Sequence, residues 1–271
     1  MDSERESVDY RNEALDPVAA YDAIAPQYSE LSAERSAYLA AVEKSIVSQI
    51  PNKARSMLDI GSGDGVRGLR IAKQAGIKDV VLLEPSPAMR AQISQDAEIW
   101  PIRAEALANY AGARERRFDV ITCLWNVLGH LPADDRKEVL RQVHRLLSPT
   151  GTFFVDLIHR YNIRSYGLIK TTLRYLKDRF APNPANGDVI VRWKTQSRSC
   201  TTQGHVFTNT EMLALAKTAG LKPKMRVAID YETGEIRPLA FQGNLLYAFR
   251  RISEIESASA ATTSSTFDSV I

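Results

Sequence analysis

Glycine and acidic residues gather in one seven-residue stretch, residues 59–65, which read Asp-Ile-Gly-Ser-Gly-Asp-Gly. A short apolar run, residues 56–60, leads into it, and apolar residues with helical spacing follow over residues 65–75. A glycine loop between a strand and a helix is where an α/β sheet binds nucleotides. Glycines permit the tight turn and let a ligand approach the backbone. We therefore expect a nucleotide-type ligand at this loop.

The glycine spacing alone does not select the ligand. Gly63, Gly65 and Gly68 satisfy the Gly-x-Gly-x-x-Gly pattern of dinucleotide sites, which is a weak signal by itself. Asp59 at the strand end and Asp64 inside the loop would both repel a pyrophosphate. A carboxylate at the strand end instead suits the ammonium group of a methionine moiety. The acidic context therefore favours a ligand that carries an amino acid.

A second carboxylate stands at the end of the next apolar run. Glu84 directly follows residues 79–83, which read Asp-Val-Val-Leu-Leu. An acid at this place can accept hydrogen bonds from both hydroxyls of a ribose. Because NAD also has such a ribose, Glu84 supports a nucleoside without choosing between ligands.

These side chains need a sheet to position them, and the chain supplies the pattern for one. Strand-like and helix-like segments alternate, which indicates a parallel sheet with helices on both faces. The expected strands are residues 56–60, 79–83, 99–102, 118–124 and 151–157, and the expected helices are residues 65–75, 87–95 and 133–147. The order then changes to a helix over 161–180, antiparallel strands at 188–194 and 204–207, a helix over 210–219, and final strands at 222–229 and 244–250.

Over roughly residues 20–157 the sequence resembles the class I (Rossmann-like) S-adenosylmethionine-dependent methyltransferases that act on small molecules. The resemblance is carried by residues 58–65, 82–87, 118–124 and 146–152. It implies a seven-stranded, mostly parallel Rossmann-like α/β sheet with an antiparallel last strand, N-terminal lid helices and a helix/β-hairpin insertion. It also implies S-adenosylmethionine as cofactor, S-adenosylhomocysteine as product, and no metal.

The resemblance assigns Asp59, Gly61 and Gly63 to the methionine portion and Glu84 to the ribose. Where many members carry an acid at the adenine edge, this chain has Arg103. The full set of expected cofactor-binding residues is Tyr28, Asp59, Gly61, Gly63, Glu84, Pro85, Met89, Ala104, Glu105 and Leu124.

The acceptor side is less defined because methyl transfer needs a general base only when the nucleophile carries a proton. His130, just past the fourth strand, is the candidate base, since histidine titrates near neutral pH. The alternative is that His130 only hydrogen-bonds its loop. Tyr21 and Tyr28 resemble the family's lid helix, or form one packed helix face. The expected substrate-pocket residues are Tyr21, Trp125, Asn126, Asp156 and His159.

We divide the chain into a flexible N-terminal tail (1–16), a methyltransferase domain (17–252) and a disordered Ser/Thr/Ala-rich tail (253–271). Within the domain, residues 158–208 form an insertion that we expect to act as a substrate lid. In it Ile169, Leu173, Leu176 and Phe180 share one helical face beside several basic residues. That helix could steer an anionic substrate, touch RNA, contact an anionic membrane surface, or be an amphipathic cover with a solvated face.

The overall composition disfavours a membrane-spanning protein and a cysteine-based metal site. The chain has 271 residues, a net charge of +3, two cysteines outside any metal-type pair, and no run of about 20 apolar residues that could cross a bilayer. We expect a cytoplasmic protein that takes a small-molecule substrate and no nucleic acid, with oligomeric state left open between monomer and homodimer. The alternatives are an RNA methyltransferase that uses the basic insertion, an NAD-linked oxidoreductase, and a non-catalytic binding module.

Overall fold

The computed structural model describes residues 15–93, 97–194 and 199–252. Its main feature in these ranges is an eight-stranded sheet in the order β3-β2-β1-β4-β5-β10-β8-β9. The first five strands in this order are parallel, and β10 runs antiparallel to both β5 and β8. Their bounds are β1 Ser56–Ile60, β2 Asp79–Leu83, β3 Glu98–Trp100, β4 Phe118–Cys123, β5 Leu147–Leu157, β8 Leu221–Ile229, β9 Ile236–Arg237 and β10 Asn244–Arg251.

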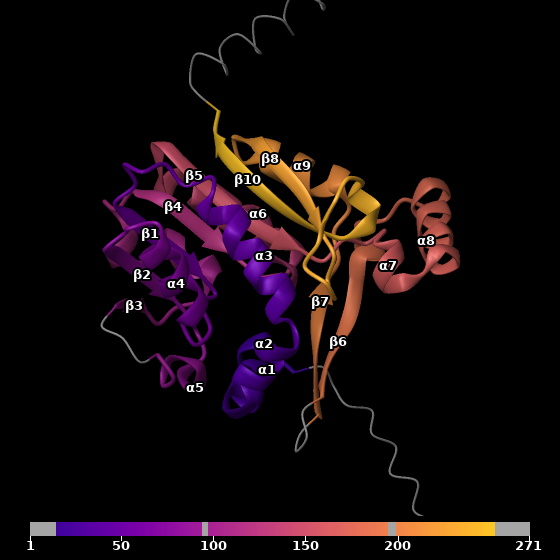
Figure 1. Ribbon diagram of the computed structural model, residues 1–271, viewed down its shortest axis with the longest axis horizontal. Helices are drawn as coiled ribbons and strands as arrows, with labels where there is room; N and C mark the ends of the chain where they lie inside the picture. The colour runs from indigo at the N-terminus through magenta and orange to yellow at the C-terminus, as the bar shows by residue number, and fades with distance from the viewer. Residues whose placement is uncertain (1–14, 94–96, 195–198, 253–271) are drawn as a thin grey trace, which may run out of the picture.

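Two apolar layers cover the two faces of the sheet. Successive residues of a strand point to opposite faces, so Leu58 and Ile60 join one layer while Met57 joins the other. In β5, Phe153 and Phe154 divide in the same way. Helices α6 (Ala133–Leu146) and α9 (Asn209–Thr218) pack on the first face, and α1 (Pro17–Ile24), α3 (Ser36–Val47) and α4 (Val66–Gln74) on the second, where Figure 1 shows α3 crossing the sheet.

This topology confirms the expected Rossmann-like α/β fold, but several elements differ from those expected. The helix expected over 87–95 is α5 (Pro87–Arg90), and the strand expected at 204–207 is β7 (Ser199–His205). The sheet has one more strand than the seven expected, because the two residues of β9 pair with the end of β8. The helix expected over 161–180 is two helices, α7 (Ile163–Tyr166) and α8 (Leu168–Phe180). Gly167 separates them with φ of 76°, a left-handed conformation that an α-helix cannot continue through.

The insertion ends in a two-stranded hairpin of β6 (Asp188–Lys194) and β7 (Ser199–His205). Figure 1 shows this hairpin reaching down beside α1 and α2 (Tyr28–Glu34), while α8 lies at the opposite margin of the insertion. Leu15 bridges to Thr202 and donates its N–H to the Thr201 carbonyl at 2.8 Å. The insertion and the N-terminal helices therefore form one continuous cover.

The two expected tails fall largely outside the described residues. Residues 1–14 and 253–271 are not described, so their disorder stays a prediction. Leu15 and Asp16, which we placed in the N-terminal tail, belong to the fold instead. Asp16 caps α1, since its carboxylate accepts the N–H of Val18 at 3.0 Å. The tail boundary therefore lies at least two residues earlier than expected.

The start of α4 is packed directly onto the end of β1. A Cβ at Gly68 would collide with the Oδ2 atom of Asp59, which is 3% exposed and cannot move into solvent. We predict that Gly68→Ala lowers the free energy of unfolding by about 1–3 kcal/mol, measured by urea denaturation. The matched control, Val66→Ala, changes an exposed side chain of the same helix and should stay within about 0.5 kcal/mol. Equal stability of both variants would contradict the packing.

Candidate active site

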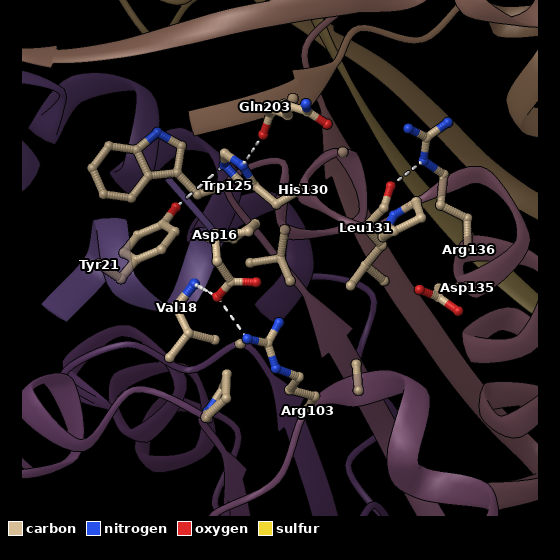
Figure 2. A pocket seen from close by; sticks show the side chains of 18 of the residues that line it. Asp16, Val18, Tyr21, Arg103, Trp125, His130, Leu131, Asp135, Arg136 and Gln203 are labelled. Atoms are coloured by element: carbon tan, nitrogen blue, oxygen red, sulfur yellow. Dashed lines mark hydrogen bonds and ion pairs between the residues drawn. The ribbon is translucent and has the colours of Figure 1, made fainter. Parts of the chain in front are cut away.

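A cavity of about 740 Å³ opens at the carboxyl edge of β1, β2 and β4. The glycine loop, the hairpin and the start of α1 all contribute residues to its lining. Figure 2 shows Val18 and Tyr21 of α1 and Gln203 of the hairpin around it. Such a volume is typical of pockets for small ligands. The lining residues that carry the argument below are Tyr21, Tyr28, Gly61, Gly63, Arg67, Glu84, Trp125 and His130.

The glycine loop turns through left-handed backbone conformations. Gly61 and Gly63 have φ of 69° and 61°, which non-glycine residues rarely adopt. A Cβ at Gly61 would also lie 2.6 Å from the side chain of Val127. The Gly61 N–H donates to the Leu83 carbonyl at 2.8 Å, and the Gly63 N–H donates to Glu84 Oε2 at 2.8 Å. The loop is therefore fixed against the end of β2 before any ligand binds.

Glu84 connects the loop to the following helix and faces the cavity. Its second oxygen accepts the N–H of Ser86 at 2.8 Å, and the residue is 6% exposed. Burial raises the pKa of Glu84 to about 7, although both backbone N–H groups favour the charged form. The carboxylate is thus fixed in position, with lone pairs left for a ligand hydroxyl.

Two residues expected at the cofactor lie behind the loop. Asp59 does not line the cavity; its Oδ1 accepts the hydroxyl of Thr122 at 2.6 Å, and burial raises its pKa to about 6. Met89 is fully buried and lies beneath Gly63, where a Cβ would meet its methyl group at 3.2 Å. Both side chains support the loop from below. The remaining expected cofactor residues that line the cavity are Tyr28, Gly61, Gly63, Glu84, Pro85, Ala104, Glu105 and Leu124.

Arg103, which stands where the resemblance implies an acid, pairs with a residue that was assigned no role from the sequence. Its guanidinium donates to Asp16 at 2.6 Å, and both residues line the cavity (Figure 2). The ion pair connects the adenine-edge segment to the start of α1. It therefore closes the cavity wall instead of presenting an acid to the ligand.

Aromatic rings form one wall of the cavity. Tyr21 lies 6.4 Å from Tyr28 and 5.9 Å from Trp193, and Tyr28 lies 5.6 Å from Trp125, measured between ring centroids. Burial raises the pKa values of both tyrosine hydroxyls above their usual range, so both stay protonated at neutral pH. Such a wall can face a cationic group, since ring faces attract positive charge.

His130 stands in this wall with a defined tautomer (Figure 2). Its Nδ1 lies 3.1 Å from the carbonyl oxygen of Gln203, which can only accept, so Nδ1 carries the proton. Its Nε2 is therefore unprotonated and accepts the Tyr21 hydroxyl at 3.4 Å. Burial lowers the pKa of His130 below its ordinary value, so the neutral imidazole predominates at neutral pH.

The loop that carries this wall begins with two strained residues. Trp125 and Asn126 have φ of 58° and 60°. The buried carboxylate of Asp156 accepts the N–H of Trp125 and the hydroxyl of Tyr38, the latter at 2.8 Å. The Asn126 amide donates to the His205 carbonyl at 3.1 Å, which connects the loop to β7. Asp156 and Asn126 therefore hold the loop and do not line the cavity.

The last expected pocket residue, His159, is also placed elsewhere. It is 3% exposed, its ring lies 5.8 Å from Tyr161, and burial lowers its pKa to about 4. It does not line the cavity. Of the five expected substrate-pocket residues, only Tyr21 and Trp125 reach it.

Known proteins resemble this chain in the part that carries the glycine loop and Glu84. Residues 58–153 match the family described as Methyltransferase domain. The ubiquinone biosynthesis O-methyltransferase of Pseudomonas syringae pv. tomato is 32% identical over 117 residues, which cover 41% of this chain and 47% of that relative. The chain therefore spans about half the length of the curated relatives that it matches.

Solved structures share the fold over a longer range. The CcbJ methyltransferase of Streptomyces caelestis has a TM-score of 0.57 at 17% identity, over 81% of this chain and 90% of its own. An S-adenosylmethionine-dependent methyltransferase of Clostridium acetobutylicum has a TM-score of 0.58 at 13% identity, over 86% of this chain and 100% of its own. Residues 58–153 therefore match a methyltransferase domain, and the chain shares its fold with these solved methyltransferases.

The matched structure from Clostridium acetobutylicum is an S-adenosylmethionine-dependent methyltransferase, and the cavity of this chain has groups that suit S-adenosylmethionine. Glu84 offers a carboxylate for hydroxyl groups, and the rings of Tyr28 and Trp125 suit a sulfonium.

Sequence reasoning missed one further residue, Arg67, on the second helical position of α4. Its Nη1 is buried and has no hydrogen-bond partner among the described residues. A basic residue directly after the glycine loop was the only available signal.

Arg67 is a buried cation at the cavity. Its guanidinium lies 5.8 Å from the centre of the Trp125 ring and lines the cavity. Burial opposes its charge, but the surrounding Tyr28, Asp156 and Asp59 outweigh burial and raise the pKa of Arg67. A permanently charged donor with an unused N–H is therefore available to an anionic ligand group.

The raised pKa of Glu84 predicts a pH dependence of stability. Between pH about 4.5 and about 7 the folded, ligand-free protein keeps a proton on Glu84 that the unfolded chain has released. The Glu84 contribution is therefore fully present below pH 4.5 and is lost as pH rises to 7, by up to about 3 kcal/mol. Urea denaturation from pH 4 to 8 should show a smaller decline for Glu84→Gln than for wild type. Glu30→Gln, an exposed control, should keep the wild-type slope.

Proposed function

We propose that this protein transfers the methyl group of S-adenosylmethionine to a hydroxyl group of a small-molecule acceptor. The observation that carries the proposal is the neutral His130, whose unprotonated Nε2 faces an aromatic-walled cavity. A hydroxyl acceptor must lose a proton, and this imidazole can take it. The name of the Pseudomonas syringae relative, an O-methyltransferase, supports the same choice of acceptor atom.

On the cofactor side, we assign the binding roles to residues whose groups are fixed before binding. Glu84 accepts the ribose hydroxyls, and the backbone of Gly61 and Gly63 lies along the methionine portion. Arg67 donates its free Nη1 to the methionine carboxylate, because it is the buried cation next to the glycine loop. Asp59 acts through the loop that it supports and does not contact the ligand.

On the acceptor side, the main contribution of the chain is positioning. The cofactor supplies a methyl group already activated by its positive sulfur. Tyr21, Trp125 and the hairpin hold the acceptor and exclude water, which orients the reacting atoms. In the reaction the acceptor hydroxyl replaces the Tyr21 hydroxyl as the donor to His130 Nε2 and passes its proton to that nitrogen, while Tyr21 stays protonated.

Two assays test the function. Calorimetric titration should show binding of S-adenosylmethionine and S-adenosylhomocysteine and no binding of NAD. Purified protein with radiolabelled S-adenosylmethionine should then label phenols and alcohols in an acceptor panel that also contains amines and RNA. Labelling confined to amines or RNA would refute the hydroxyl assignment, and tight cofactor binding without turnover on any acceptor would favour a binding module.

Arg67 gives a sharp test of the cofactor assignment. We predict that Arg67→Met weakens S-adenosylmethionine affinity about 10- to 100-fold, since a hydrogen bond to a charged group contributes about 1.5–3 kcal/mol. Calorimetry measures the change. Arg70→Met is the matched control. Arg70 lies three residues after Arg67 on the same helix, and it binds Glu43 at 3.2 Å outside the cavity. Similar affinities for both variants would remove Arg67 from the site.

His130 gives a separate test of proton transfer. At saturating cofactor, kcat of the wild type should rise with pH through a pKa below the ordinary histidine value and then stay level, because only the neutral imidazole accepts a proton. His130→Asn should lower kcat about 100-fold or more and abolish this rise. His144→Asn, on α6 and outside the cavity, should keep the wild-type profile. An unchanged profile in His130→Asn would assign His130 to the loop alone.

A further inference from the structure

The helix α8 presents its apolar side to solvent. Ile169, Leu173, Leu176 and Phe180 recur at helical spacing and are 78%, 62%, 42% and 79% exposed. Leu168, at the start of the helix, is 71% exposed. Figure 1 shows α8 at the margin of the molecule, away from the sheet. An apolar stripe of this kind normally packs on the core, so its outward position needs a cause.

The side of α8 that packs on the protein is polar. Asp178 accepts hydrogen bonds from Arg160, at 2.6 and 2.9 Å, and from the Tyr161 hydroxyl at 2.6 Å. Arg174 stacks on the ring of Tyr166 at 4.0 Å and donates to the Arg160 carbonyl. These directional contacts fix the rotation of the helix. The exposed apolar side is therefore a consequence of specific bonds on the opposite side.

Positive charge flanks the apolar side. Lys170 and Lys177 lie along one edge and Arg179 along the other, all exposed and none in an ion pair within the described part of the chain. Asp178, the one acid of this helix, is neutralised by Arg160. The outward surface of α8 is thus apolar in the middle and basic at its edges. Long basic side chains at such edges can extend their charges to a polar boundary.

We propose that α8 is a docking helix for an anionic phospholipid surface. Apolar side chains enter the boundary between headgroups and acyl chains while Lys170, Lys177 and Arg179 meet the anionic headgroups. A second copy of this chain would place the same basic residues opposite one another, which like-charge repulsion disfavours. The apolar stripe and the basic edges together select this occupant.

This inference is independent of the methyl acceptor, because α8 contributes no residue to the cavity. It does concern the same insertion, since the cavity-lining hairpin begins eight residues after α8 ends. Docking through α8 therefore holds the insertion at the membrane surface.

Vesicle flotation with the full chain tests the proposal. The probes are vesicles of phosphatidylcholine alone and vesicles with phosphatidylglycerol added. Wild type should float with the anionic vesicles, and less so at high salt. Ile169→Glu/Leu173→Glu and Lys170→Glu/Lys177→Glu should each lower the bound fraction on the order of tenfold. Lys73→Glu/Lys78→Glu makes the same charge change at exposed lysines in and just after α4, a helix that Figure 1 shows far from α8, and should bind within about twofold of wild type.

Three results would overturn the proposal. Wild type could fail to float with anionic vesicles, or all variants could bind equally. Alternatively, sedimentation velocity could show that wild type self-associates and that Ile169→Glu/Leu173→Glu is monomeric, which would make α8 an interface between copies. Circular dichroism and thermal unfolding of each variant verify folding, since the changed side chains are exposed.

Discussion

The buried carboxylate of Asp156 is the contact on which the cavity wall depends. It accepts the N–H of Trp125, a residue that turns through a left-handed conformation with φ of 58°. Such a conformation costs about 1–3 kcal/mol in a non-glycine residue, so surrounding contacts must fix it. The following loop brings Val127 against Gly61 and carries His130 into the aromatic wall. A single buried acid at the end of β5 thereby fixes the cavity wall that adjoins the glycine loop.

Burial shifts the pKa values of two cavity residues, Glu84 and His130, in opposite directions. It raises the pKa of Glu84 to about 7 and lowers that of His130, because low dielectric disfavours the charged form of either group. His130 is thereby suited to accept a proton at neutral pH. Arg67 keeps its charge, since neighbouring acids and Tyr28 outweigh its burial. The site thus combines a fixed cation, a titrating carboxyl group and a neutral base.

The sequence predicted the fold and the positions at which strands meet the ligand. The parallel order of β1, β2 and β4 puts Gly61, Glu84 and Leu124 at one edge, because carboxyl ends of parallel strands coincide. What it did not predict is side-chain direction. Asp59 stands at the position expected to contact the ligand, but its carboxylate accepts the hydroxyl of Thr122 behind the glycine loop. Its direction depends on the partner that β4 supplies across the sheet.

The sequence by itself determined the fold class and the place of the glycine loop in it, since the loop and the strand-helix alternation are local patterns. Only the tertiary structure decided which polar groups face the cavity. Asn126, Asp156 and His159 are bonded or packed elsewhere, whereas Arg67 remains free to meet a ligand. Likewise, periodicity showed that α8 is amphipathic, but its bonds to Arg160 and Tyr161 turned the apolar side outward. Periodicity identifies the sides of an element, and only contacts between distant segments decide which side is buried.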